Sequence, residues 1–215
     1  MNKNSPLYLF TFVIILCIVF GAGINVVHYS TLAMLEKNST LHQNRIIARA
    51  FKLQPTKESA EGYEDIISQN VTVDTISDKS SSFVTFSDTE GHIGFKFEGM
   101  GFWDRIAGIL VFSNNLSKVY SIEFLDQKET PGLGARIEEP WFKKQFDGIT
   151  IDWSGPEDER IIISQSSNDK KMNQVDAITW ATQTSMALMN FLNSQLNSFK
   201  KVYQNSDRSK EGNHG

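Results

Sequence analysis

The stretch "HIGFKFEG" (92–99) decides the fold, because it is the clearest of several short segments in which apolar residues alternate with other residues. Ile93, Phe95 and Phe97 stand at every second position, so their side chains share one face of an extended strand. "VYSIEFL" (119–125) shows the same alternation. Further strands are expected at 71–76, 83–86, 106–112 and 160–164. Together these segments predict a mixed, largely antiparallel sheet.

Helices are expected to pack on this sheet. In "EEPWFKKQFDG", Pro140 suits the first turn of a helix, and Trp141, Phe142 and Phe146 can cover the sheet. The last helix has apolar residues in steps of three and four, which make one buried stripe: Leu188, Leu192, Leu196, Phe199 and Tyr203. The sequence therefore predicts an α+β fold.

The N-terminal part carries the run "LYLFTFVIILCIVFGAGINVV" (7–27), which has no charged residue and is as long as a bilayer-crossing helix requires. A cleaved signal peptide is the alternative, but its apolar run is usually shorter. Lys3 precedes the run, while Glu36 and Lys37 follow it and cancel, so the N-terminus is expected in the cytoplasm. The single cysteine, Cys17, lies inside the run, which leaves the remaining domain without disulfides.

Four segments are expected along the chain: a cytoplasmic tip and transmembrane anchor (1–28), a helical connector (29–70), one α+β domain (71–205) and a polar tail (206–215). The connector is predicted to hold a helix over 30–53, with a break near Asn38 and Ser39. The 215 residues carry a net charge of −4. Since no basic run is interleaved with aromatic residues, a nucleic-acid partner is not expected.

Common catalytic and metal-binding patterns are missing from the sequence. The four histidines are scattered without metal-ligand spacing, and there is no cysteine cluster, so no metal site is predicted. There is also no nucleophile elbow, Walker loop or dinucleotide glycine fingerprint. No catalytic dyad is predicted.

"KETPGLGAR" (128–136) is a candidate ligand-binding turn that follows "GMGFWDRIAG" with Trp103. Proline at the second and glycine at the third position of Thr130–Leu133 predict a type II turn, with Gly132 at positive φ. Gly134 would let the backbone approach a ligand, and Glu129 adds a carboxylate beside it. An ordinary turn after a strand is the alternative.

"NQVDAITWATQTSMALMNFL" (173–192) places an unusual number of hydroxyl residues at the start of the last helix. Asp176 or Thr179 can cap this helix, and Thr182 would lie in its first turn or just before it. Unpaired N–H groups and the positive end of the helix dipole attract a phosphate there. A hydroxyl so placed can contact a phosphate or be esterified by one; capping alone is the alternative.

Three stretches in this order, "GMGFW", "ETPGLGARIEEPWFKKQFDG" and "DAITWATQTS", resemble the FMN-binding domain found in the G subunit of Rnf electron-transport complexes and in the C subunit of the Na⁺-translocating NADH:quinone oxidoreductase (Nqr). The resemblance implies that Thr182 carries FMN through a phosphoester, installed from FAD by a flavin transferase. Asp176, Thr179 and Ala181 match the family motif, and Thr184 and Ser185 also suit it. Trp180 stands where the family has glycine.

The resemblance further implies which residues contact the flavin and where the protein works. The implied contacts come from Trp103 and from Glu129, Thr130, Gly132, Leu133 and Gly134, while Trp180, which departs from the family motif, could itself lie against the isoalloxazine ring. It implies an electron-transfer subunit of a membrane ion-translocating oxidoreductase, with other membrane subunits and the lipid bilayer as partners. The implied location is the bacterial inner membrane, crossed once, with the FMN domain on the periplasmic side. The alternative is a flavin-free or non-covalently flavin-binding interaction module of the same fold.

Overall fold

The computed structural model describes residues 6–113 and 115–211, with side chains up to residue 206. Lys3, the tip of the predicted anchor and the end of the polar tail lie outside these residues. The chain divides into two compact units, Met1–Leu41 and His42–Gly215.

The first long element, α1 (Pro6–Ala50), is one unbroken helix that spans the boundary of the two units. The predicted break at Asn38 and Ser39 does not occur. The adjacent hydroxyl of Thr40 donates to the carbonyl oxygen of Glu36 at 3.0 Å and so bonds back within the helix rather than competing with it. The apolar part of α1 is long enough to cross a membrane, and none of it is buried within the described chain.

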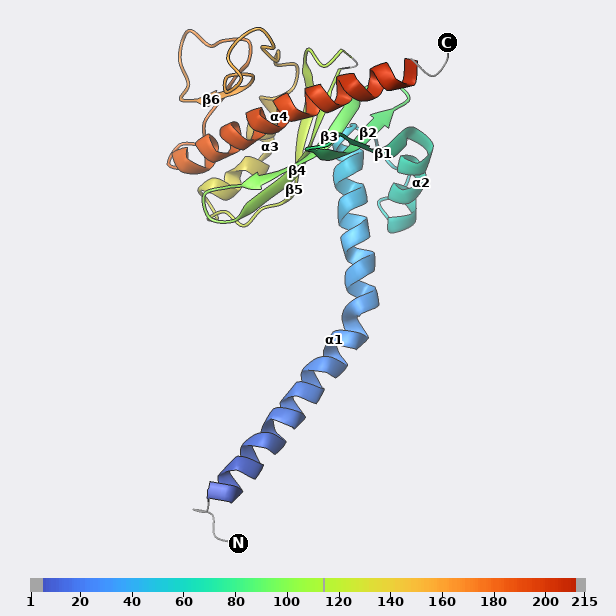
Figure 1. The fold of residues 1–215 in the computed structure, drawn as a ribbon, viewed down its shortest axis with the longest axis vertical. Coiled ribbons are helices and arrows are strands. Elements are labelled where there is room, and N and C mark those ends of the chain that lie inside the picture. The colour runs from blue at the N-terminus through green and yellow to red at the C-terminus, as the bar shows by residue number, and fades with distance from the viewer. Residues whose placement is uncertain (1–5, 114, 212–215) are drawn as a thin grey trace. The chain divides into compact units, whose positions relative to one another are not determined.

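The main sheet has five antiparallel strands in sequential order: β1 (Val71–Ser77), β2 (Ser82–Asp88), β3 (Ile93–Met100), β4 (Arg105–Phe112) and β5 (Val119–Asp126) (Figure 1). All five predicted strands are confirmed. Phe95 pairs with Leu110, and Leu110 pairs with Ile122, so the register brings the predicted apolar faces together. The alternation of apolar residues sets this register, because a slip by one residue would turn the apolar side chains to the opposite face.

A separate parallel pair joins β6 (Ile162–Ser164) to β7 (Gln174–Asp176). The strand predicted at 160–164 therefore exists, but it lies outside the five-stranded sheet. The partner β7 was not predicted, because three residues are too short to show a period of two. Its last residue, Asp176, leads directly to the start of the last helix.

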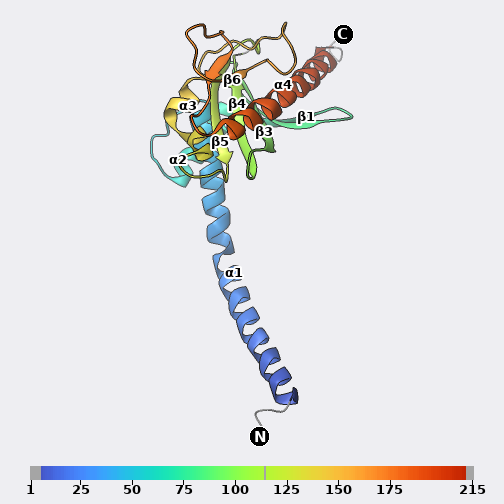
Figure 2. The same cartoon turned by 90° about the vertical axis from the view of Figure 1, so that its left-hand side faces the viewer.

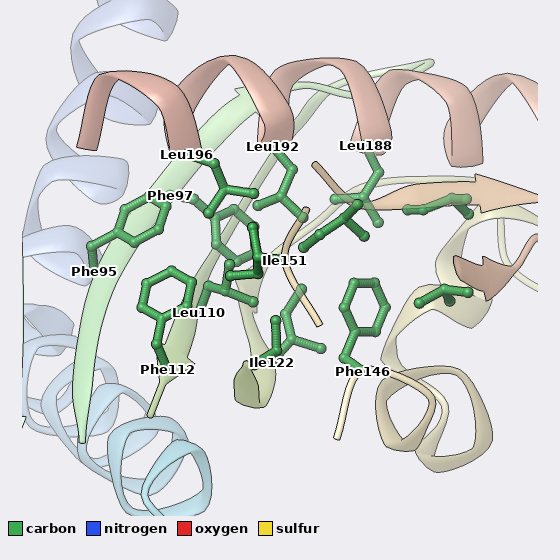
Figure 3. Close-up of a cluster of buried hydrophobic side chains, with 14 of the residues drawn as sticks. Phe95, Phe97, Leu110, Phe112, Ile122, Phe146, Ile151, Leu188, Leu192 and Leu196 are labelled. Atoms are coloured by element: carbon green, nitrogen blue, oxygen red, sulfur yellow. The ribbon is translucent and has the colours of Figure 1, made fainter. Parts of the chain in front are cut away.

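The last helix, α4 (Thr182–Glu211), covers one face of the main sheet (Figure 1). Its predicted stripe is confirmed, because Leu188, Leu192 and Leu196 are fully buried. Figure 3 shows these leucines pointing from α4 toward Phe95, Phe97 and Leu110 of the strands. Each buried leucine contributes about 1.5–3 kcal/mol to folding, so the stripe holds the start of α4 in place.

The other face of the sheet packs against the end of α1 and against α2 (Ala60–Asn70), both of which lie beside the sheet in Figure 2. Ile46 and Phe51 meet Ile109 and Val111 of β4 there. Because β4 is buried on both faces, it forms the centre of the domain. The side chain of Ser59 caps α2 by accepting from the N–H of Gly62 at 3.1 Å.

Between β5 and β6 the chain forms a short 3₁₀ helix, η1 (Gly134–Glu138), and α3 (Pro140–Lys144). Pro140 occupies the first turn of α3 as predicted, and Phe142 and Phe146 are fully buried. Trp141 does not cover the sheet: it remains 40% exposed because its position on α3 faces a surface cavity.

Candidate functional site

The turn Thr130–Leu133 lies at the edge of the site and has the predicted geometry. The N–H of Leu133 donates to the carbonyl oxygen of Thr130 at 3.1 Å. Gly132 has φ of +74°, as the third position of a type II turn requires. No atom lies within 4 Å of a Cβ built on Gly132, so glycine is needed there for its backbone angle and not for space.

Glu129, just before this turn, connects three separate segments of the chain. Its carboxylate accepts from the backbone N–H of Trp103 at 2.9 Å and from the hydroxyl of Thr184 at 2.7 Å. Only 4% of Glu129 is exposed. A buried carboxylate needs such donors, because leaving it without them costs more than the bonds contribute when made.

The glycines around Glu129 are explained by close packing. A Cβ on Gly134 would lie 2.5 Å from the Thr184 hydroxyl and 2.7 Å from the Glu129 carboxylate, and one on Gly101 would lie 2.5 Å from the same carboxylate. Gly134 is therefore glycine because the Glu129–Thr184 pair approaches its backbone. Gly134 also lines the smaller of the two cavities at this site, so its contact with a ligand stays a prediction.

A second turn, Ile178–Ala181, precedes α4. The N–H of Ala181 donates to the carbonyl oxygen of Ile178 at 3.0 Å, and Trp180 at the third position has φ of +66°. A bulky residue in this conformation costs about 1–2 kcal/mol relative to an ordinary backbone angle. Backbone geometry thus favours glycine at this position, and Trp180 adopts the same angle at a cost.

The hydroxyl residues at the start of α4 have different roles. Thr184 and Ser185 are buried: Thr184 donates to Glu129, and the Ser185 hydroxyl accepts from the N–H of Ile178 at 3.2 Å. Thr179 and Thr182 are exposed, and Thr182 is the first residue of the helix. Two hydroxyls are therefore used inside the protein, and two face solvent at the helix N-terminus.

Asp176 does not cap α4, contrary to one expectation from the sequence. It ends β7, where the Lys170 ammonium lies 3.1 Å from its Oδ2 atom. The Gln145 side chain fixes this point of the chain by accepting from the N–H of Asp176 at 2.9 Å. The Oδ1 atom of Asp176 is buried and has no hydrogen-bond partner among the described residues. This acceptor can take a hydrogen bond from water or from a bound molecule.

Two cavities meet at this helix start. The larger, about 870 Å³, is bordered by Trp141, the end of β6, residues 176–180, Thr182 and Met186. The smaller, about 290 Å³, lies between Trp103, the Glu129–Gly134 segment and residues 180–184. Trp180 and Thr182 line both cavities. The larger one has the size usual for a cofactor site.

The predicted site residues thus gather around these cavities, although they come from three segments of the chain. The smaller cavity is lined by Trp103, Glu129, Thr130, Leu133, Gly134, Trp180, Ala181, Thr182 and Thr184, and the larger by Asp176 and Thr179 as well as Trp180 and Thr182. Gly132 shapes its turn without lining either cavity. Phe102 and Gln145 were missed: Phe102 adjoins the predicted Trp103, but nothing in the sequence connects Gln145 with Asp176.

Trp141 stands at the rim of the larger cavity and is held in place by charged neighbours. Its indole N–H donates to the carboxylate of Glu139, and the Arg136 guanidinium lies 5.4 Å from its ring centre. The hydrogen bond from Trp141, together with Arg136, holds the pKa of Glu139 below its usual value. This side of the cavity is therefore fixed by contacts within the protein itself.

Away from the cavities, the hairpin between β2 and β3 gathers Asp88, Glu90 and His92. His92 Nδ1 lies 2.7 Å from Asp88 Oδ2, and Asp88 Oδ1 accepts from the N–H groups of Glu90 and His92. The tight turn brings these groups together although the sequence shows no ligand spacing. Their hydrogen bonds account for the turn itself.

Comparison with known proteins matches residues 101–197 to the family model of the FMN-binding domain. The chain is 31% identical over 94 residues to the C subunit of the Na⁺-translocating NADH-quinone reductase of Pasteurella multocida, and this match covers 44% of the chain and 36% of that protein. It is 28% identical over 157 residues to the G subunit of the ion-translocating oxidoreductase complex of Methanosarcina acetivorans, covering 66% of the chain and 76% of that protein. The match thus spans little more than a third of the Pasteurella relative.

Solved structures show the same fold. The crystal structure of the C subunit of the Na⁺-translocating NADH-quinone reductase from Parabacteroides distasonis aligns with a TM-score of 0.66 and 19% identity, covering 79% of this chain and 94% of that one. The crystal structure of Shewanella oneidensis NqrC aligns with a TM-score of 0.56 and 16% identity, covering 73% of this chain and 96% of that one. The resemblance predicted from the sequence is confirmed: residues 101–197 match the model of the FMN-binding domain, and the chain is similar to the Nqr C subunit and to the Rnf G subunit.

Proposed function

We propose that this chain is a membrane-anchored electron-transfer flavoprotein, one subunit of an ion-translocating oxidoreductase of the Rnf or Nqr type, with FMN attached covalently to Thr182. One observation carries the proposal: Thr182 is an exposed hydroxyl residue at the N-terminus of α4, where the two cavities of the FMN-binding domain meet. FMN when bound accepts and donates electrons, so the chain needs no catalytic acid or base.

The residues present suit a flavin phosphate and its sugar-like chain. The first N–H groups of α4 have no partner within the helix, and its first turn holds no acidic residue that would repel a phosphate. The unpaired Oδ1 atom of Asp176 borders the same cavity as Thr182 and can accept from a ribityl hydroxyl. Glu129 holds the two turns together, so it shapes the cavity rather than reacting.

Attachment requires a phosphoryl transfer at Thr182. The Thr182 hydroxyl oxygen attacks the FMN-side phosphorus of FAD in the flavin transferase; the new O–P bond forms as the bond to the bridging pyrophosphate oxygen breaks. AMP leaves, and the hydroxyl proton passes to solvent. No electron is gained or lost. The exposed position of Thr182 supports this step, because the transferase must reach the hydroxyl.

The membrane anchor and its orientation belong to the same proposal. The exposed apolar part of α1 supports a single crossing of the bacterial inner membrane. Lys3 before it favours a cytoplasmic N-terminus and a periplasmic FMN domain, with other membrane subunits of the complex as partners. Protease added to intact spheroplasts should digest the FMN domain; protection in spheroplasts and digestion only in inverted vesicles would contradict this orientation.

The test of covalent attachment uses the full chain produced together with an active flavin transferase. Denaturing electrophoresis should show a fluorescent band, and the peptide with Thr182 should gain the mass of FMN less one water. Thr182→Val should abolish the band without unfolding the protein, because valine keeps the shape and removes only the exposed hydroxyl. Thr179→Val is the matched control, since Thr179 is also exposed at the larger cavity, and it should keep the band.

A flavin-free interaction module of the same fold is the second candidate, and Trp180 favours it. Its side chain occupies the family's glycine position beside the attachment residue and borders both cavities. If the wild type shows no band and Trp180→Gly does, Trp180 blocks the transferase and the second candidate replaces the first. If neither shows a band, covalent attachment is rejected altogether.

A further inference from the structure

Trp180 is anomalous in both its backbone and its side chain. Its φ of +66° is a conformation that bulky residues rarely adopt. Such an angle persists only where the surroundings enforce it, and it is concentrated at binding sites. The surroundings here do enforce it: Ile178 and Ala181 on either side are buried, and the hydrogen bond between them closes the turn.

The Trp180 indole makes little stabilising contact with the rest of the described chain. It is 86% exposed, and no hydrogen bond or ring contact joins its side chain to any residue that the structure describes. The other three tryptophans all have partners. Trp103 packs edge-to-face on Phe102, Trp141 bonds to Glu139, and Trp153 donates to the Leu116 carbonyl oxygen at 2.7 Å.

The position of Trp180 indicates what its indole contacts. It is two residues before Thr182, and these two residues line both cavities. FMN bonded to Thr182 through its phosphate would carry its planar ring on the ribityl chain, and Trp180 lines whichever of the two cavities that ring enters. Aromatic rings prefer offset-stacked or edge-to-face arrangements, and the indole is the largest aromatic side chain, with the widest face to offer a flat ring.

From this arrangement we infer that the Trp180 indole stacks on the isoalloxazine ring of the FMN carried at Thr182. The inference rests on the proposed function and adds a positioning role for a residue that the family motif does not contain. Trp180 covers one face of the ring, excludes water from that face and quenches the flavin's fluorescence by contact. Hydrogen bonds fix Trp141 and the Glu129–Gly134 turn in place, whereas the Trp180 side chain is free to adjust its orientation to the ring.

The test measures flavin fluorescence per bound flavin in the full chain, produced with an active transferase and purified in detergent. Bound flavin is determined separately from its visible absorbance, so that a change in loading does not affect the result. Trp180→Leu should raise the fluorescence several-fold, because leucine fills space but neither stacks nor quenches. Trp180→Tyr should keep the fluorescence low, because tyrosine retains a ring that stacks and quenches.

Trp153→Phe is the matched control, because Trp153 lines a separate cavity with Thr150 and Lys171, and it should leave flavin fluorescence unchanged. Equal fluorescence per flavin in wild type and Trp180→Leu overturns the inference while leaving the attachment of FMN intact. A wild type without bound flavin rejects the proposed function, and this inference with it.

Discussion

The turns Thr130–Leu133 and Ile178–Ala181 have the same geometry but different residues at the critical position. Each is closed by a hydrogen bond from its fourth N–H to its first carbonyl oxygen, and each has a positive φ at its third residue. That residue is Gly132 in the first turn and Trp180 in the second. Backbone geometry alone favours glycine at both places, so the tryptophan needs a reason beyond the fold.

The surroundings of the two turns explain how the difference is tolerated. Both are tied to the same buried pair, because Glu129 precedes the first turn and Thr184 follows the second. A Cβ on Gly132 would meet nothing within 4 Å, and the Trp180 side chain is exposed. Neither turn is therefore limited by space at its third position, and the comparison isolates the effect of the backbone angle.

The largest expected effect comes from separating the two turns. Thr184→Val removes the hydroxyl that donates to Glu129 and leaves a buried carboxylate oxygen without this donor. We expect the free energy of unfolding of the full chain in detergent to fall by about 3 kcal/mol. Urea titration of wild type and variant measures this difference in the free energy of unfolding. Thr184→Ser keeps the hydroxyl and should lose much less; equal losses would show that the hydrogen bond is unimportant.

A smaller effect is expected when the first turn loses its glycine. Gly132→Val should lower the free energy of unfolding by about 2 kcal/mol, because a β-branched residue is strained at φ of +74°. Gly132→Asn is the control, since asparagine tolerates this angle better than other residues. Urea titration compares the two. If asparagine is as costly as valine, the backbone angle is not the cause.

The smallest effect is expected when the second turn regains a glycine. In chain produced without the transferase, Trp180→Gly should raise the free energy of unfolding by about 1 kcal/mol, because it removes strain that no contact offsets. Thr179→Gly is the matched control: Thr179 is exposed in the same turn but has no positive φ, so glycine there should destabilise. A loss of stability in both variants would contradict the strain at Trp180.

Local patterns in the sequence were sufficient for most elements of the fold. The five strands of the main sheet, the helix beginning at Pro140 and the stripe of α4 were all predicted, because their signals are repeats within a few residues. The type II turn was predicted for the same reason, since Pro131 and Gly132 restrict neighbouring backbone angles directly. The short strand β7 was missed because it is too brief to repeat.

The candidate site depends on contacts that no local pattern reveals. The motif around Thr182 identified the right helix start, but not that Asp176 would end a strand beside Lys170 instead of capping the helix. Gly134 was predicted to contact a ligand, and only the packing shows that the Glu129–Thr184 pair lies against its backbone. Glu129 and Thr184 stand 55 positions apart in the chain, so the sequence alone could not pair them.

The sequence by itself determined which segments form strands and helices, and that glycine suits the third position of the turn at Thr130, because these properties depend on near neighbours. Only the tertiary structure decided that two such turns border the same two cavities, and that a buried carboxylate joins them. It also decided that Trp180 takes the angle of a glycine while its side chain stays exposed. The physical reason is that burial and backbone strain depend on which distant segments pack together, and that packing is a property of the whole domain.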